Sequence, residues 1–205
     1  MKPILFNTEM VRAILAGRKT VTRRIIKDPW YIDDEELSRV SGLAIHRGTN
    51  TTDGMPYPDR PYSPGDILYV RETWRVQSAR RFDADVRIEF KAGGDVVRIQ
   101  FPGGGDQYHS RAQYDDFVYR WADDRWHPSI HMPRESARIF LRVTDVRIER
   151  LQEIDDAGVV AEGLEIGAPF DELWDKTIKP KERHIFSWSA NPWTWVIRFE
   201  RTEKP

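Results

Sequence analysis

Short segments in which apolar and polar residues alternate, with few helices between them, constrain the fold of this chain most. The clearest pair, 86–91 and 96–101, flanks Gly93-Gly94 and predicts a β-hairpin. A doubly wound parallel sheet would need a helix after most strands, and those helices are missing. The pattern therefore favours an α+β fold, a small β-barrel with short flanking helices and long inserted loops. The expected strands cover 19–26, 67–72, 86–91, 96–101, 138–149 and 193–200, and the expected helices cover 8–16 and 155–163.

The length of 205 residues suits one elaborated domain rather than two. The stretch around 27–64 is rich in proline and acidic residues and has little regular pattern. A second stretch, around 77–135, holds the hairpin and further loops. We expect both stretches to be insertions in a single domain that spans residues 1–205.

The charge balance and the lack of cysteine exclude several classes of protein. Lys and Arg total 32 against 33 for Asp and Glu, so the chain does not coat nucleic acid through a net positive field. Without cysteine there is no disulfide, thiolate nucleophile or cysteine zinc site. His127 and His131 have no carboxylate near them in the sequence to complete a metal set, so we expect neither a metal nor a cofactor. With no signal-peptide core and no membrane-length apolar stretch, we expect a soluble, cytoplasmic protein.

The densest chemical signal is the run 17–24, GRKTVTRR, which has four basic residues and no acid. A lysine beside threonine hydroxyls can serve as a base if burial removes its proton. The alternative is a solvated cationic strand edge, a common protection against edge-to-edge pairing. In an extended strand Lys19 and Thr22 would point to opposite faces, so they can meet only if Lys19 precedes the strand.

Two further features are candidates for function. Glu162 lies in the last turn of the expected helix 155–163, where the helix dipole disfavours a carboxylate. It is therefore either exposed to solvent or held there for a role such as accepting a proton. The segment 126–134, WHPSIHMPR, combines prolines with planar side chains, which would suit either a base-stacking pocket or simple loop packing.

Taken in order along the chain, these motifs resemble those of the ASCH domain family, whose fold is a PUA-like β-barrel. The run 17–24 is similar to the family signature Gly-x-Lys-x-x-Glu-x-Arg, with Thr22 in place of the glutamate. The other similar segments are Pro64-Gly65-Asp66-Ile67-Leu68, 142–151, Ala161-Glu162-Gly163-Leu164 and 193–199. The long loops and the segment 126–133 resemble the subgroup that is common in phages and prophages.

A threonine at this signature position is shared with small bacterial ASCH enzymes that hydrolyse N4-acetylcytidine to cytidine and acetate. The resemblance implies that Lys19, Thr22 and Glu162 are catalytic. Lys19 would be the base for the Thr22 hydroxyl, and Glu162 would pass a proton to the leaving amine. The residues that we expect to bind substrate are Arg23, Arg24, Trp126 and His131.

Other functions remain open at this point. PUA-like barrels commonly read RNA, so an RNA- or nucleotide-binding module, or a ribonuclease, is an alternative to the amidohydrolase. The phage subgroup also suggests a non-catalytic accessory protein. The expected partner is thus a nucleoside or RNA, and the sequence does not determine the oligomeric state. Convergence of Lys19, Thr22 and Glu162 in one pocket would favour the enzyme.

Overall fold

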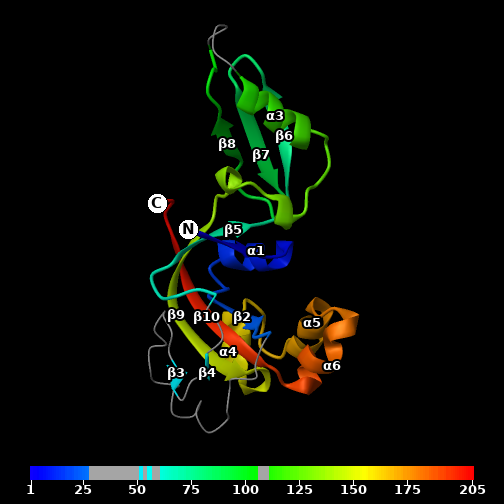
Figure 1. Cartoon of the computed structure of the whole chain (residues 1–205). Coiled ribbons are helices and arrows are strands. Elements are labelled where there is room, and N and C mark those ends of the chain that lie inside the picture. The colour runs from blue at the N-terminus through cyan, green and yellow to red at the C-terminus, as the bar shows by residue number, and fades with distance from the viewer. Residues whose placement is uncertain (28–50, 53–54, 57–60, 106–110) are drawn as a thin grey trace. The chain divides into compact units, whose positions relative to one another are not determined.

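The computed structural model of the chain, drawn in Figure 1, describes residues 1–27, 51–52, 55–56, 61–105 and 111–205. These residues divide into two compact units. The first unit comprises Met1–Ala16, Ile67–Arg142 and Arg201–Pro205, and the second comprises Gly17–Asp66 and Val143–Glu200. Most of the irregular stretch 27–64 lies outside the described residues, and the single domain expected over 1–205 stays a prediction.

In the first unit, strand β1 (Lys2–Leu5) pairs in parallel with β5 (Ile67–Arg71). Strand β5 also pairs antiparallel with the start of β9 (Phe140–Arg150). Helix α1 (Thr8–Leu15) follows β1 directly. The alternation of apolar residues along β5 buries Leu68 and Val70 completely, which fixes the face that each strand turns to the interior.

The first unit also contains a separate three-stranded sheet, in the order β6-β7-β8. Its strands are β6 (Trp74–Arg80), β7 (Asp85–Phe90) and β8 (Val97–Gln100), and α3 (Ala112–Trp121) lies beside them in Figure 1. The sheet and the helix share a core of buried side chains, among them Trp74, Val86, Ile88, Phe90, Tyr114 and Met132. Two single turns of 3-10 helix, η2 (Ser129–His131) and η3 (Arg134–Ser136), lead from α3 towards β9.

In the second unit, β2 (Val21–Ile25) pairs antiparallel with β10 (Trp193–Thr202), and β10 lies next to β9. The short strands β3 (Thr51–Thr52) and β4 (Met55–Pro56) pair with each other. The helical elements are α4 (Asp156–Ala161), α5 (Phe170–Thr177), α6 (Arg183–Phe186), η4 (Leu151–Glu153), η5 (Pro180–Glu182) and η6 (Trp188–Ala190). Leu151, Trp174 and Ile178 form a small core under these helices.

The helix ends follow the capping residues that the sequence supplies. The side chain of Asn7 accepts a hydrogen bond from the Met10 backbone N–H at 2.8 Å and begins α1. The side chain of Asp155 accepts one from the Gly158 N–H at 2.7 Å and begins α4, which ends at the expected Glu162-Gly163. Among the residues that the structure describes, no helix is both long and apolar enough to cross a membrane.

The mixed α and β content confirms an α+β fold, and the hairpin around Gly93-Gly94 is formed by β7 and β8. The expectation that six strands close into one barrel is wrong for the described residues, which form separate sheets and no closed barrel. The reason is β6, a strand that the sequence pattern did not predict. It pairs with the hairpin, and α3 covers the resulting sheet, so this sheet has its own core.

Candidate functional site

The segment before β2 lies against the C-terminal end of α4, entirely within the second unit. Lys19 forms an isolated antiparallel bridge with Glu162, and the Thr20 backbone N–H donates a hydrogen bond to the Ala161 carbonyl at 2.8 Å. The last carbonyls of a helix lack partners inside the helix, so these contacts satisfy groups that would otherwise need water. Local backbone pairing therefore brings a lysine and a glutamate together that lie far apart in the sequence.

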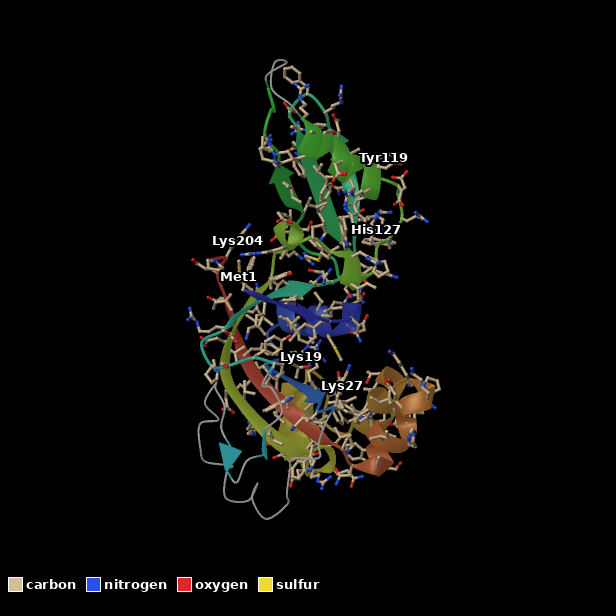
Figure 2. The ribbon with its side chains drawn as sticks, viewed as in Figure 1. Met1, Lys19, Lys27, Tyr119, His127 and Lys204 are labelled. Carbon is tan, nitrogen blue, oxygen red and sulfur yellow. The ribbon has the colours of Figure 1, made fainter. Side chains whose placement is uncertain are left out.

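The side chains of Lys19 and Glu162 form a buried ion pair. The Lys19 Nζ lies 2.5 Å from Glu162 Oε2 and donates a second hydrogen bond to the Glu162 backbone carbonyl at 3.0 Å. Only 2% of Lys19 and 8% of Glu162 are exposed to solvent. Figure 2 shows Lys19 at the start of β2. The interpretation of Glu162 as a solvent-exposed residue is therefore wrong, and a cation balances its charge at the end of the helix.

A second cation reaches the same carboxylate. Arg23 Nη1 lies 3.4 Å from Glu162 Oε1, and Arg23 Nη2 lies 3.1 Å from Glu149 Oε2 on β9. Glu149 also contacts Arg147. The Nε of Arg23 is buried and has no hydrogen-bond partner among the described residues. Strand β2 lies at the edge of its sheet, but burial of Lys19 and Arg23 shows that the solvated cationic edge is the wrong interpretation for both.

Burial changes the acid–base chemistry of the site. The pKa of Lys19 is lowered from its ordinary value because burial disfavours the charged amine, and this outweighs the attraction of Glu162. The nearby charges of Arg24 and Arg23 lower the Lys19 pKa further. Burial also lowers the pKa of Arg24 against the attraction of Glu162 and Tyr62. Burial raises the pKa of the Tyr62 hydroxyl, despite the neighbouring Arg24.

Thr22 lies on β2, opposite Ile197 of β10, and is almost completely buried. Lys19 lies before β2, which begins at Val21, so the strand's alternation does not force the two side chains apart. The structure thus brings Lys19 and Glu162 into contact, with Thr22 three residues along the chain. The catalytic role of Thr22 stays a prediction.

The other two expected substrate-binding residues belong to the first unit, where their described contacts also lie. The Arg75 guanidinium lies 4.7 Å from the centre of the half-exposed Trp126 ring, and the His131 ring lies 6.2 Å from that of Trp121. His127 Nε2 lies 3.1 Å from Asp123 Oδ1, a contact that the sequence analysis did not predict. Even so, no three His, Cys, Asp or Glu side chains of the described part of the chain gather as a metal site.

Two residues of the site, Glu149 and Tyr62, were not predicted from the sequence. Glu149 lies on β9, where it alternates with Arg147 and Asp145 on one face of the strand. That alternation of charges on a strand next to β10 is the signal that could have pointed to a partner for Arg23, and the sequence analysis did not use it. Tyr62 follows the long irregular stretch, and no local pattern links it to Arg24.

Comparisons of the chain with family models, with curated proteins and with solved structures find no match. The resemblance to the ASCH family therefore rests on the sequence motifs alone. The roles of the site residues rest on those motifs together with the contacts described above.

Proposed function

We propose that this chain hydrolyses the amide of an acylated pyrimidine nucleoside such as N4-acetylcytidine, giving cytidine and acetate. The observation that carries the proposal is the buried contact of Lys19 with Glu162 directly before the strand that holds Thr22. The similarity of the run 17–24 to the ASCH signature supports the same residues. The proposal also assigns the sheet that contains β2 and β10 to a PUA-like fold of the ASCH type.

The geometry suits Lys19 to act as a base. A neutral amine carries two hydrogens, which suffice for the two hydrogen bonds from Nζ to Glu162. The contact with Glu162 can therefore persist when Lys19 gives up its third proton, and burial lowers the Lys19 pKa. A lysine with these properties can accept the proton of a threonine hydroxyl, which is a weak nucleophile without a base.

The proposed reaction proceeds through an acylated Thr22. Thr22 Oγ1 attacks the acyl carbonyl carbon, and its proton passes to Lys19 Nζ. The bond between that carbon and the exocyclic nitrogen then breaks, and Glu162 passes the proton from Lys19 to the leaving nitrogen. Water attacks the threonine ester and gives a proton to Lys19, which passes it to Thr22 Oγ1 as the ester bond breaks. Acetic acid leaves and ionises to acetate in solvent, so Lys19 is neutral again for the next turnover. The guanidinium of Arg24 would stabilise the negative charge on the acyl oxygen in both steps.

A second candidate function, binding of RNA or a nucleotide, is favoured by one observation in the first unit. The half-exposed Trp126 ring already stacks with the Arg75 guanidinium, and planar groups of this kind also stack on nucleic acid bases. The burial of Lys19 and Arg23 favours this function less, because cations that contact a phosphate backbone would be exposed.

One incubation separates the two functions. The purified chain is mixed with N4-acetylcytidine and, in parallel, with short single-stranded RNA, and the products are separated by liquid chromatography. We expect cytidine and acetate in equal amounts from the first reaction and intact RNA from the second. Cleaved RNA, or RNA bound tightly without turnover of the nucleoside, would favour a function on RNA over hydrolysis of N4-acetylcytidine.

A further inference from the structure

The two carboxylate oxygens of Glu162 have different partners. Oε2 lies 2.5 Å from Lys19 Nζ, whereas Oε1 lies 3.4 Å from Arg23 Nη1. One buried carboxylate is thus shared by two buried cations. A carboxylate shared in this way is held in one orientation, because rotation towards either cation would weaken the contact with the other.

Arg23 is itself held from the other side. Its Nη2 contacts Glu149 Oε2 at 3.1 Å, and Glu149 projects from β9. The planar guanidinium can bridge two carboxylates in fixed geometry, which the single ammonium of a lysine does not reproduce. Gly158 of α4 lies beside the guanidinium, because a Cβ at Gly158 would meet Ile154 Cγ1 at 2.8 Å, Asp155 Oδ1 at 3.1 Å and Arg23 Nη2 at 3.3 Å.

We propose that Arg23 is a positioning residue which, anchored by Glu149, holds the second oxygen of Glu162 and offsets part of its charge, so that Lys19 does not experience the full attraction of this carboxylate. Arg23 acts through Glu162 and does not touch the reacting atoms. The proposal rests on the proposed function for its catalytic consequence, but the arrangement of charges is independent of any substrate. It replaces the expectation from the sequence that Arg23 binds substrate.

The charges near Lys19 determine whether a substitution at Arg23 or Glu149 raises or lowers the Lys19 pKa. Glu162 attracts the Lys19 proton, whereas Arg23 and Arg24 on β2 repel it, and Tyr62 faces Arg24. Loss of the positive charge of Arg23 removes one of the cations that share Glu162, so Lys19 should hold its proton more tightly. Loss of the negative charge of Glu149 frees Arg23 to pair fully with Glu162, so Lys19 should release its proton more easily.

The test measures the titration of Lys19 directly, by NMR on the full chain with 13C-labelled lysine. The variants are Arg23→Gln and Glu149→Gln, and the signal is assigned by its loss in Lys19→Arg. Arg198→Gln, an exposed arginine on β10, serves as the matched control. We expect the Lys19 midpoint to rise by about one pH unit in Arg23→Gln and to fall in Glu149→Gln. Arg198→Gln should leave it unchanged.

Shifts of the two midpoints in the same direction, or no larger than in Arg198→Gln, would overturn the proposal. If Arg23→Gln does not fold, Glu149→Gln decides alone: a lowered midpoint supports the proposal and an unchanged one overturns it. The pH dependence of kcat/KM on N4-acetylcytidine should shift with the midpoint. Opposite NMR shifts without any turnover by the parent would leave the positioning role standing and refute the proposed function.

Discussion

The Lys19→Arg variant is expected to bind N4-acetylcytidine but to turn it over about 10²–10⁴-fold more slowly than the parent chain. Arginine keeps a positive charge beside Glu162, so the electrostatic environment of the substrate is largely preserved. The guanidinium stays protonated at every accessible pH and cannot accept the Thr22 proton. The loss should therefore appear in kcat, with a smaller change in KM.

The pH dependence gives this prediction a second measurement. A base must be neutral, so kcat/KM of the parent should rise with pH through the Lys19 pKa, which burial places below the ordinary 10.5. This rise should be absent from Lys19→Arg. Lys27→Arg, a change at the exposed lysine labelled in Figure 2, is the matched control and should keep both the rate and the rise. If Lys19→Arg turns over substrate at the parent rate, Lys19 contributes only its positive charge and is not the base.

Glu162→Gln is expected to lower the free energy of unfolding by about 3–5 kcal/mol, the usual cost of removing one partner from a buried ion pair. The carboxylate balances two cations that are almost completely buried, Lys19 and Arg23. Glutamine has the same shape but no charge, so Lys19 loses the attraction of Glu162 in a low-dielectric site. Urea denaturation at pH 7 measures the loss, and Glu165→Gln, at an exposed glutamate after α4, should change stability little.

The loss of unfolding free energy in Glu162→Gln should depend on pH in a fixed direction. The Lys19 pKa is lower in the folded chain than the ordinary 10.5, so the folded state binds fewer protons there than the unfolded state. Stability from this group therefore increases as pH rises from the lowered pKa towards 10.5, and loss of the attraction to Glu162 lowers that pKa further. The difference between parent and variant should shrink between pH 7 and 10. A deficit that grows over this range would contradict the buried pair.

Stability should be recovered when both charges are removed together. The double variant Lys19→Met/Glu162→Gln leaves no unbalanced amine in the site, so it should be more stable than Glu162→Gln alone. If the double variant instead loses the sum of the two single losses, the two side chains do not interact.

The parts of the fold that depend on local signals could be predicted from the sequence. Asn7 and Asp155 cap helices as expected, because a capping side chain bonds to a backbone N–H only three residues away. The hairpin at Gly93-Gly94 forms because both glycines accept the positive φ that its turn requires. Strand β6 was missed because its outer half is exposed and polar, so the apolar alternation stops after Val76.

The candidate site could be predicted only in part for the same reason. Glu162 could be identified because the helix dipole disfavours a carboxylate at the C-terminal end of a helix. The structure shows it buried beside Lys19. Arg23 contacts both Glu162 and Glu149. These contacts depend on the pairing of segments that are distant in the sequence, which local spacing does not encode. The charge run alone suggested an exposed strand edge, since nothing within it shows that α4 and β9 bring carboxylates to its arginines.

The most direct test of the proposed site compares Thr22→Val and Thr22→Ser with the parent chain, by following release of cytidine from N4-acetylcytidine. Valine matches threonine in shape and removes only the hydroxyl, whereas serine keeps the hydroxyl and removes only the methyl group. Thermal melts of all three chains confirm that each is folded before rates are compared. The account predicts that Thr22→Ser retains part of the parent rate and that Thr22→Val loses almost all of it; release of cytidine by Thr22→Val at the parent rate would contradict it.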